Sequence, residues 1–293
     1  MKCLSLILIV IISLNSLSCR KSKFDSELFK IKFAGEKRCY LLHIPENFNT
    51  KGTKSLIIAL HGGLGSPRNV EEQSGLSQTS DSEGFIVCYP QGLNKTWNAG
   101  ECCGKAVKKD RDDVGFISYL IDELLANYDI DPNRVYVTGM SNGGFMCYRL
   151  ACEIPNKIAG IAPVSATMAA KYCNPTESTP IIHFHSYNDS NVPYQGGVGD
   201  GPSKSHKAPL DSVFTVWNSL NNCTTTKTLV YDGTDYDRWT WSNCSNGVEM
   251  ELYITHDGGH QWPMGVKSRG KSDDPSIVIN ANILMWEFFK KFW

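Results

Sequence analysis

Short apolar segments that end in turn residues alternate with amphipathic segments along this chain, and this alternation restricts the fold more than any other feature. Residues 55–60 and 85–89 are continuous apolar runs followed by Gly- or Pro-containing turns, as is typical of strands buried on both faces. Residues 112–128 repeat apolar side chains at helical spacing and begin with two aspartates. We therefore expect parallel strands joined by helices.

The same alternation continues to the C-terminus and follows an N-terminal hairpin, which we expect within residues 29–45. Further strands are expected at residues 135–137, 158–164, 180–185 and 250–255, and helices at residues 142–152, 210–220 and 277–292. This order predicts an α/β fold with a doubly wound, mostly parallel sheet and helices on both faces. No repeat or Pro-rich linker interrupts it, so we expect one domain over residues 25–293.

The first residues predict export from the cell. Lys2 precedes an apolar run at residues 4–12 and a small, polar stretch at residues 13–18, the pattern of a secretory signal. The run is too short to span a bilayer. We expect residues 1–18 to be a signal peptide and the mature protein to be extracellular. Cys19 directly after this pattern resembles a bacterial lipoprotein acceptor, so a lipid anchor at the cell surface is the alternative.

Charge and cysteine content narrow the class of protein further. The chain has 29 basic and 30 acidic side chains and no long run of like charge, which argues against nucleic acid as a partner. Of 11 cysteines, Cys3 lies in the signal, and the even number that remains suits disulfides in an oxidising compartment. We expect Cys223 to pair with Cys244, and the adjacent Cys102 and Cys103 to pair elsewhere, since neighbours rarely bond.

Residues 139–143 form a G-x-S-x-G pattern between a predicted strand and a predicted helix. This pattern is typical of a nucleophile elbow, in which glycines allow a sharp turn and Ser141 projects from it. A helix-capping role for Ser141 is the structural alternative.

A serine nucleophile needs a base and a carboxylate later in the chain. His260 follows the last predicted strand, where we expect the base, and His256 is its competitor. Asp189 follows the strand at residues 180–185, where a carboxylate could orient the base. Asp211 and Asp232 are reserve candidates.

An acyl-transfer site also needs hydrogen-bond donors for the oxyanion. The Gly-rich residues 61–65 follow an early strand, and we expect one donor at the backbone N–H of Gly63 or Leu64. The second donor is expected at the N–H of Asn142. The alternative is that residues 61–65 are only a flexible turn.

These features together resemble the secreted α/β-hydrolases related to feruloyl esterases and polyhydroxybutyrate depolymerases. The resemblance covers nearly the whole mature chain and is carried by residues 60–63, 89–92, 97–100, 102–104, 112–117, 138–144, 189, 192–194, 258–260 and 262–263. It implies the α/β-hydrolase fold over residues 25–293, with Ser141 as nucleophile, Asp189 as acid and His260 as base. Ser186 departs from the glycine that is frequent there in relatives.

The resemblance also implies that Trp97, Tyr194 and Trp262 line an acyl or aromatic pocket, although core packing explains these aromatic residues equally well. His183 and His185 alternate on one strand, but no third ligand follows with fitting spacing, so we assign no metal and read them as buried structural histidines.

The predicted function is therefore a serine carboxylic-ester hydrolase that needs no cofactor. The expected substrate is a feruloyl or related ester of a plant polysaccharide. A polyhydroxybutyrate-type polyester is the alternative substrate. A peptidase with the same order of catalytic residues is a further enzymatic alternative, and a noncatalytic hydrolase-fold protein that binds a partner at the cell surface is the rival from another class.

Overall fold

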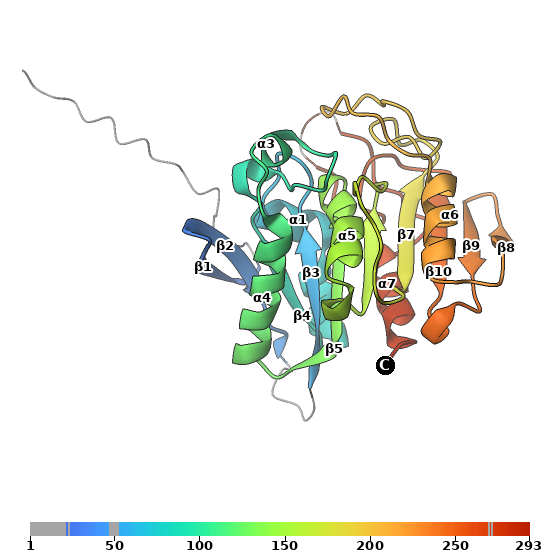
Figure 1. Cartoon of the computed structure of the whole chain (residues 1–293). Helices are drawn as coiled ribbons and strands as arrows, with labels where there is room; N and C mark the ends of the chain where they lie inside the picture. The colour runs from blue at the N-terminus through green and yellow to red at the C-terminus, as the bar shows by residue number, and fades with distance from the viewer. Residues whose placement is uncertain (1–21, 23, 47–52, 269, 271) are drawn as a thin grey trace, which may run out of the picture.

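The computed structural model describes residues 22, 24–46, 53–268, 270 and 272–293. A ten-stranded sheet in the order β1-β2-β4-β3-β5-β6-β7-β10-β9-β8 organises them (Figure 1). The strands are β1 (Glu27–Phe33), β2 (Glu36–His43), β3 (Lys54–Leu60), β4 (Ile86–Pro90), β5 (Ile130–Met140), β6 (Gly160–Val164), β7 (Ile181–Ser186), β8 (Thr228–Asp232), β9 (Tyr236–Trp241) and β10 (Met250–Thr255). The α-helices are α1 (Pro67–Ser74), α2 (Leu76–Glu83), α3 (Gly104–Lys108), α4 (Asp113–Asn127), α5 (Asn142–Glu153), α6 (Leu210–Leu220) and α7 (Ala281–Lys290).

The middle of the sheet is parallel, from β4 through β3, β5, β6 and β7 to β10. Antiparallel strands flank it, with β1 and β2 on one side and β9 and β8 on the other. Parallel strands all end at the same edge of a sheet, so the segments that follow β3, β5, β7 and β10 come together there. The predicted mostly parallel sheet and the N-terminal hairpin are confirmed.

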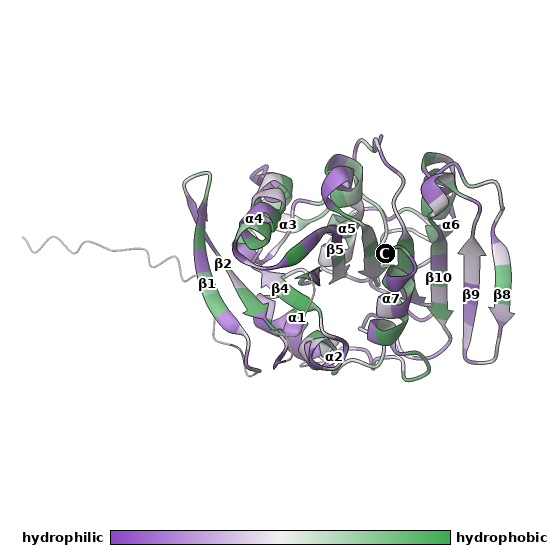
Figure 2. Cartoon of the chain, turned by 90° about the horizontal axis from the view of Figure 1, so that it is seen from below, coloured by the Kyte–Doolittle hydropathy of each residue, from purple (hydrophilic) through white to green (hydrophobic). Residues whose placement is uncertain are grey.

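Helices cover both faces of this sheet, as Figure 2 shows from below. On one face, α4, α5 and α6 bury Phe116, Tyr148 and Trp217 in one core. On the other face, α1, α2 and α7 contribute to a second core that contains Val70 and Trp286. The doubly wound arrangement predicted from the alternation of strands and helices is therefore confirmed.

Several elements differ from the prediction. The helices α1 and α2 and the strand β8 were not predicted. The two helices are short and mostly polar, and β8 is an edge strand with every residue exposed, so none of the three has the apolar periodicity that marks a core element. The last helix begins at Ala281 instead of residue 277, because the Asn280 side chain caps the N–H groups of Asn282 and Ile283.

The disulfides confirm one predicted pair and correct another. Cys223 bonds Cys244 as predicted. The prediction that Cys102 and Cys103 pair elsewhere is wrong, because they bond each other across a cis peptide, with their Cα atoms 3.1 Å apart. General spacing rules for disulfides do not anticipate this arrangement. A further bridge joins Cys152 to Cys173.

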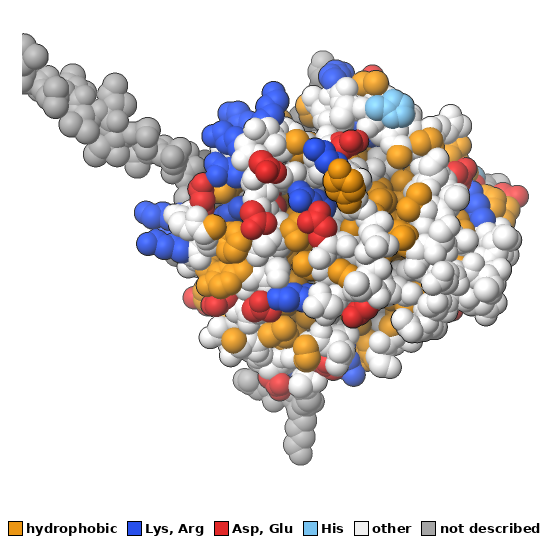
Figure 3. Space-filling model, in the orientation of Figure 1, with side chains coloured by type: hydrophobic (Ala, Val, Ile, Leu, Met, Phe, Trp, Pro, Cys, Tyr) orange, Lys and Arg blue, Asp and Glu red, His pale blue; other side chains and the backbone are white. Residues whose placement is uncertain are grey.

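Residues 1–18 and Cys19 lie outside the described residues, so the predicted signal peptide and lipid anchor remain predictions. Among the helices that the structure describes, none combines the length and apolar character needed to cross a bilayer. On the face shown in Figure 3, acidic and basic side chains are interspersed with apolar groups.

We predict that Arg38→Met lowers the free energy of unfolding by about 3 kcal/mol, because it leaves the buried carboxylate of Asp113 without its cation. The two side chains are almost fully buried and lie 2.9 Å apart, joining β2 to the start of α4. Urea unfolding measures the change. The matched control is Lys157→Met, which breaks the exposed pair with Asp122 and should cost less than about 1 kcal/mol. Equal losses in the two variants would contradict the larger contribution of the buried Arg38–Asp113 pair to stability.

Candidate active site

Ser141 lies at the sharp turn between β5 and α5, at the edge where the parallel strands end. Its backbone has φ 53° and ψ −123°, which side-chain-bearing residues rarely adopt. A Cβ atom on Gly143 would lie 2.7 Å from the carbonyl carbon of Leu60, and one on Gly139 would lie 2.8 Å from the Leu60 oxygen. Glycines at these positions therefore let the turn pack directly against the end of β3.

Asp189 and His260 come from the loops after β7 and β10, which are neighbouring strands. The Nδ1–H of His260 donates to Oδ2 of Asp189 at 2.8 Å. The Asp189 side chain is fully buried, and the His260 side chain is 12% exposed. Asp189 Oδ1 accepts the backbone N–H groups of Asn191 and Val192 at 3.0 and 2.8 Å. The backbone thus fixes the carboxylate that holds the imidazole.

The environment of Asp189 keeps it ionised. Burial on its own raises the pKa of this carboxyl, but the charge and hydrogen bond of His260 and the contributions of His185 and the Val192 amide outweigh burial. The pKa of Asp189 therefore lies below its ordinary value. An ionised carboxylate can orient the imidazole and stabilise it once it takes up a proton.

The competing residues do not join this pair. His256 bonds the Thr234 carbonyl at 3.0 Å and lies 3.4 Å from Asp237. Asp211 pairs with an exposed lysine, Lys227. Asp232 lies on β8, at the far edge of the sheet.

A chain of buried hydrogen bonds ends at Val192, the residue whose N–H binds Asp189. Tyr148 Oη donates to His183 Nδ1 at 2.8 Å, His183 Nε2 donates to His185 Nδ1 at 3.1 Å, and His185 Nε2 donates to the Val192 carbonyl at 2.8 Å. Burial lowers the pKa of both histidines, so each is a neutral ring with one donor and one acceptor, as this order of bonds requires. His185 Nε2 is also 3.6 Å from Oδ2 of Asp189.

Ser186 connects the two loops that carry Asp189 and His260. Its hydroxyl donates to the Asp257 carbonyl at 3.0 Å and accepts the N–H of Asn188 at 3.1 Å. A glycine here could make neither bond. Serine in place of this glycine therefore adds hydrogen bonds that join the Asp189 and His260 loops.

Two backbone N–H groups are available beside Ser141. Asn142 is the first residue of α5, so its N–H has no acceptor within the helix. A Cβ on Gly63 would lie 3.9 Å from that of Asn142, and the Gly63 N–H has no partner among the described residues. The N–H of Leu64, by contrast, already donates to the Lys95 carbonyl at 2.7 Å. Of the two alternatives, the geometry favours Gly63.

His61 fixes the loop that carries Gly63. Its buried ring donates through Nδ1 to the Gly62 carbonyl at 2.7 Å and accepts the Gly92 N–H at Nε2, 3.0 Å away. Burial lowers the pKa of His61 to about 4, so the ring is neutral and can make both bonds at neutral pH. It therefore positions the loop and is not free to act as a base.

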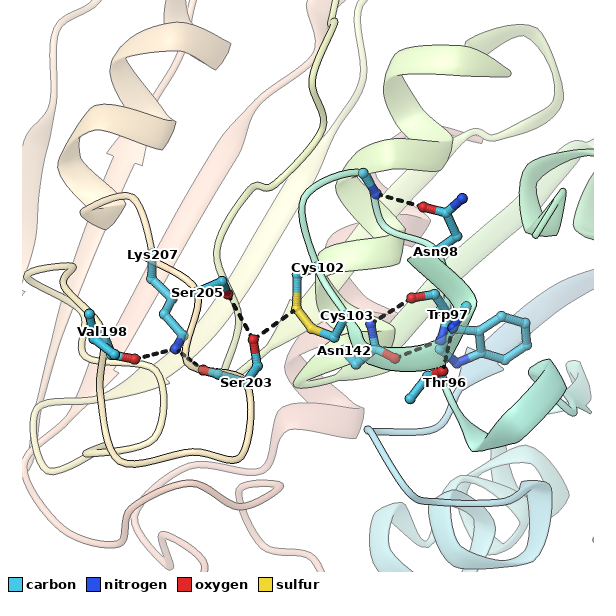
Figure 4. The surroundings of a disulfide bond; sticks show 12 residues. Thr96, Trp97, Asn98, Cys102, Cys103, Asn142, Val198, Ser203, Ser205 and Lys207 are labelled. Atoms are coloured by element: carbon cyan, nitrogen blue, oxygen red, sulfur yellow. Dashed lines mark hydrogen bonds between the residues drawn. A yellow bond between two sulfur atoms is a disulfide. The ribbon is translucent and has the colours of Figure 1, made fainter. Parts of the chain in front are cut away.

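The side chain of Asn142 binds a second loop. Its Oδ1 accepts the Trp97 N–H at 2.7 Å, and its Nδ2 donates to the Trp97 carbonyl at 3.0 Å (Figure 4). The Trp97 indole donates to the His61 carbonyl at 2.9 Å. Farther along the same loop, the Cys102–Cys103 disulfide faces Ser203, whose Oγ is 3.9 Å from the Cys102 sulfur (Figure 4).

Ser141 and His260 line one pocket of about 1240 Å³. Gly63, Leu64 and Asn191 line it as well, and among the described residues no Phe, Tyr or Trp does. Charged and amide side chains are frequent in its wall and include Arg68, Glu72, Gln73, Lys95, Gln261 and Asp273. This wall offers many hydrogen-bond donors and acceptors.

The three predicted substrate contacts do not lie in this pocket. Trp97 is fully buried, and Trp262 is buried with its indole N–H donating to Asn282 at 2.9 Å. Tyr194 is half-buried and packs edge-on against Tyr187, with ring centroids 4.7 Å apart. We therefore assign Trp97 and Trp262 to the support of the site.

Some residues of the site are not among the sequence predictions. Asp273 accepts the backbone N–H of His260 at 2.7 Å, and Gln261 accepts the amide of Gln73 at 2.9 Å. Asp273 comes from the loop after β10, whose course no local pattern predicts. The only local signal is its position shortly after His260 in the chain.

A family model described as phospholipase/carboxylesterase matches residues 108–207. Feruloyl esterase B of Piromyces equi is 28% identical over 76% of this chain and 42% of its own length. Feruloyl esterase C of Emericella nidulans is 26% identical over 86% of this chain and 83% of its own length. Poly(3-hydroxyalkanoate) depolymerase C of Paucimonas lemoignei is 32% identical over 42% of this chain and 30% of its own length.

Among solved structures, an acetyl xylan esterase from Aspergillus awamori superposes with a TM-score of 0.62, covering 90% of this chain and 99% of that one. Its sequence identity is 15%, so this likeness concerns the fold alone. It is the α/β-hydrolase fold that the sequence predicts. The predicted resemblance to feruloyl esterases and polyhydroxybutyrate depolymerases is likewise confirmed by the sequence matches.

We predict that Gly143→Ala destabilises the protein by about 2 kcal/mol, because the added methyl group overlaps the carbonyl of Leu60. Alanine otherwise favours a helix over glycine, so a loss of stability would isolate the steric clash. Gly63→Ala is the control, since its Cβ would have ordinary contacts and should change the free energy of unfolding by less than about 1 kcal/mol. Chemical unfolding compares the two. A neutral or stabilising Gly143→Ala would contradict the close packing of this turn.

Proposed function

We propose that this chain, a carboxylic ester hydrolase of the α/β-hydrolase fold, is a secreted serine esterase that works through an acyl-enzyme. One observation carries the proposal. Ser141 and His260 line the same pocket, and His260 is hydrogen-bonded at 2.8 Å to the buried carboxylate of Asp189. A hydroxyl, an imidazole and a carboxylate in this arrangement are the groups that nucleophilic ester cleavage requires.

In the first step, Ser141 Oγ attacks the ester carbonyl carbon while His260 Nε2 accepts the hydroxyl proton. Asp189 accepts the Nδ1–H of His260 throughout, which selects the tautomer with a free lone pair at Nε2. The negative charge that develops on the carbonyl oxygen is stabilised by the N–H groups of Asn142 and Gly63. Each such donor contributes about 3 kcal/mol to transition-state stabilisation.

The tetrahedral intermediate then collapses, and His260 gives its proton to the leaving alkoxide, which departs as an alcohol. Water attacks the acyl group on Ser141, and His260 accepts the proton of the water. The second intermediate releases the carboxylic acid and restores Ser141. The alcohol must leave on the side of His260, because the same imidazole protonates it.

The polar pocket suggests an ester of a plant polysaccharide, feruloyl or related. Amide and charged side chains in its wall can hydrogen-bond to the hydroxyl groups of a sugar. The relatives named as feruloyl esterases agree with this substrate class. A hydroxyalkanoate polyester, the substrate in the name of another relative, offers few hydrogen-bond donors to such a wall.

The rival noncatalytic function leaves the pocket unexplained. A surface that only binds a partner needs neither a strained serine turn nor a histidine oriented by a buried carboxylate.

The proposal of secretion rests on the signal-like residues 1–18 and on the disulfides, which suit an oxidising compartment.

We predict that Ser141→Ala and His260→Ala each lower kcat/KM by at least about 1,000-fold, because each removes a group that acts as part of one unit. The measurement uses p-nitrophenyl acetate and butyrate, methyl ferulate, acetylated xylotriose and a hydroxybutyrate oligomer. His256→Ala is the matched control, since this histidine lies outside the pocket and should retain activity on p-nitrophenyl acetate within about twofold. Turnover that survives in Ser141→Ala would overturn the serine mechanism.

The buried histidines yield a second prediction. His185→Leu removes the bond to the Val192 carbonyl that fixes the turn around Asp189, so we expect kcat to fall about tenfold with little change in KM. His185→Gln keeps an N–H donor and should recover most of this loss.

A double-mutant cycle separates positioning from general destabilisation. In an Asp189→Asn background, His185→Leu should lower kcat by less than about threefold, because its effect passes through Asp189. Equal losses in the two backgrounds would show that His185 does not act through the carboxylate.

A further inference from the structure

A second, shallower groove of about 370 Å³ lies beside the catalytic pocket. Tyr187, Pro193 and Asp200 border it, and so does Asp189, the carboxylate that holds His260. Ser190 lines both cavities, so the groove adjoins the pocket at this residue. Apart from Asp189, the mechanism described above uses none of the residues that line this groove.

The ring of Tyr187 is rigidly held at the groove although it is 37% exposed. Its hydroxyl donates to Asp237 Oδ2 at 2.6 Å, so the polar end of the ring already has a partner. The rings of Tyr194 and His256 pack against it, with centroids 4.7 and 5.1 Å away. Tyr187 therefore offers an aromatic surface whose orientation is already fixed before a ligand binds.

Hydrogen-bond acceptors line the same groove as this ring. The Asp200 carboxylate is exposed and has no partner among the described residues, while its backbone N–H donates to the Ser190 carbonyl at 2.8 Å. Asn188 donates its amide N–H to the His256 carbonyl at 2.8 Å, which leaves its amide oxygen free. An apolar ring flanked by free acceptors matches a ligand with an apolar C–H face and hydroxyl donors at its edge.

We propose that the Tyr187 groove is a subsite for a neutral pyranose sugar of the glycan chain that carries the ester. The inference rests on the proposed function and adds the position of the sugar. The leaving alcohol must meet His260, and the groove borders the loop that holds this histidine. The alcohol side of the substrate is therefore directed toward Tyr187, and binding energy gained there favours glycan esters over small esters.

The first test compares two substrates, acetylated xylotriose and p-nitrophenyl acetate. We expect Tyr187→Leu to lower the ratio of their kcat/KM values by about tenfold, as the loss of one stacked sugar face implies. Tyr187→Phe keeps the ring and should retain most of the ratio. Asp200→Ala should lower the ratio several-fold, and Asp200→Asn, which keeps one acceptor oxygen, should restore part of it. Thermal unfolding of each variant shows that it is folded.

Tyr172→Leu is the matched control, because Tyr172 is 86% exposed and lines neither cavity. It should leave the ratio unchanged. A ratio that Tyr187→Leu and Asp200→Ala also leave unchanged would overturn the subsite. If Tyr187→Leu instead impairs methyl ferulate and spares acetylated xylotriose, the groove binds the acyl group and the proposal is wrong.

A binding experiment separates this proposal from the proposed function. Titration calorimetry of Ser141→Ala with ester-free xylotriose should detect binding that Tyr187→Leu weakens about tenfold. If the wild-type protein hydrolyses none of the esters and Ser141→Ala still binds xylotriose, the esterase proposal fails and the sugar subsite stands. If esters are hydrolysed but xylotriose does not bind at millimolar concentration, the subsite fails and the esterase stands.

Discussion

The close packing of the Ser141 turn against the end of β3 is the contact on which the site depends. Any side chain on Gly139 or Gly143 would collide with the carbonyl group of Leu60. Because β3 and β5 end so near each other, the loop after β3 brings Gly63 close to the first turn of α5. One packing constraint therefore places Ser141, the proposed nucleophile, beside the two N–H groups proposed as oxyanion donors, without a side chain dedicated to that purpose.

Neutral buried histidines then fix the loops around this turn. His61 binds the loop of Gly63, and His185 binds the turn that surrounds Asp189. Burial lowers the pKa of each, so each ring keeps one donor and one acceptor at neutral pH. Burial has a different outcome at Asp189, where hydrogen bonds and the nearby imidazole keep the carboxyl ionised. Burial thus leaves His61 and His185 neutral, as groups that position loops, whereas Asp189 stays charged.

The two neighbouring cavities differ in the side chains that line them. The larger one is lined by amide and charged groups and, among the described residues, by no Phe, Tyr or Trp, while the Tyr187 groove presents a fixed ring and free acceptors. Both adjoin the loop of Asp189 and Ser190. In the proposed mechanism, a single loop therefore both orients the His260 imidazole and borders the proposed sugar subsite, so a sugar bound there would influence the geometry of the proposed base.

The sequence by itself determined the alternation of strands and helices, the glycine turn at Ser141 and the order of serine, carboxylate and histidine, because these depend on local periodicity and on turn chemistry. The tertiary structure decided what local patterns do not contain. It engages the N–H of Leu64 with Lys95, buries Trp97 and Trp262 behind the pocket, and joins Cys102 to Cys103. These outcomes depend on contacts between segments far apart in the chain, or on a backbone geometry that residue spacing does not encode.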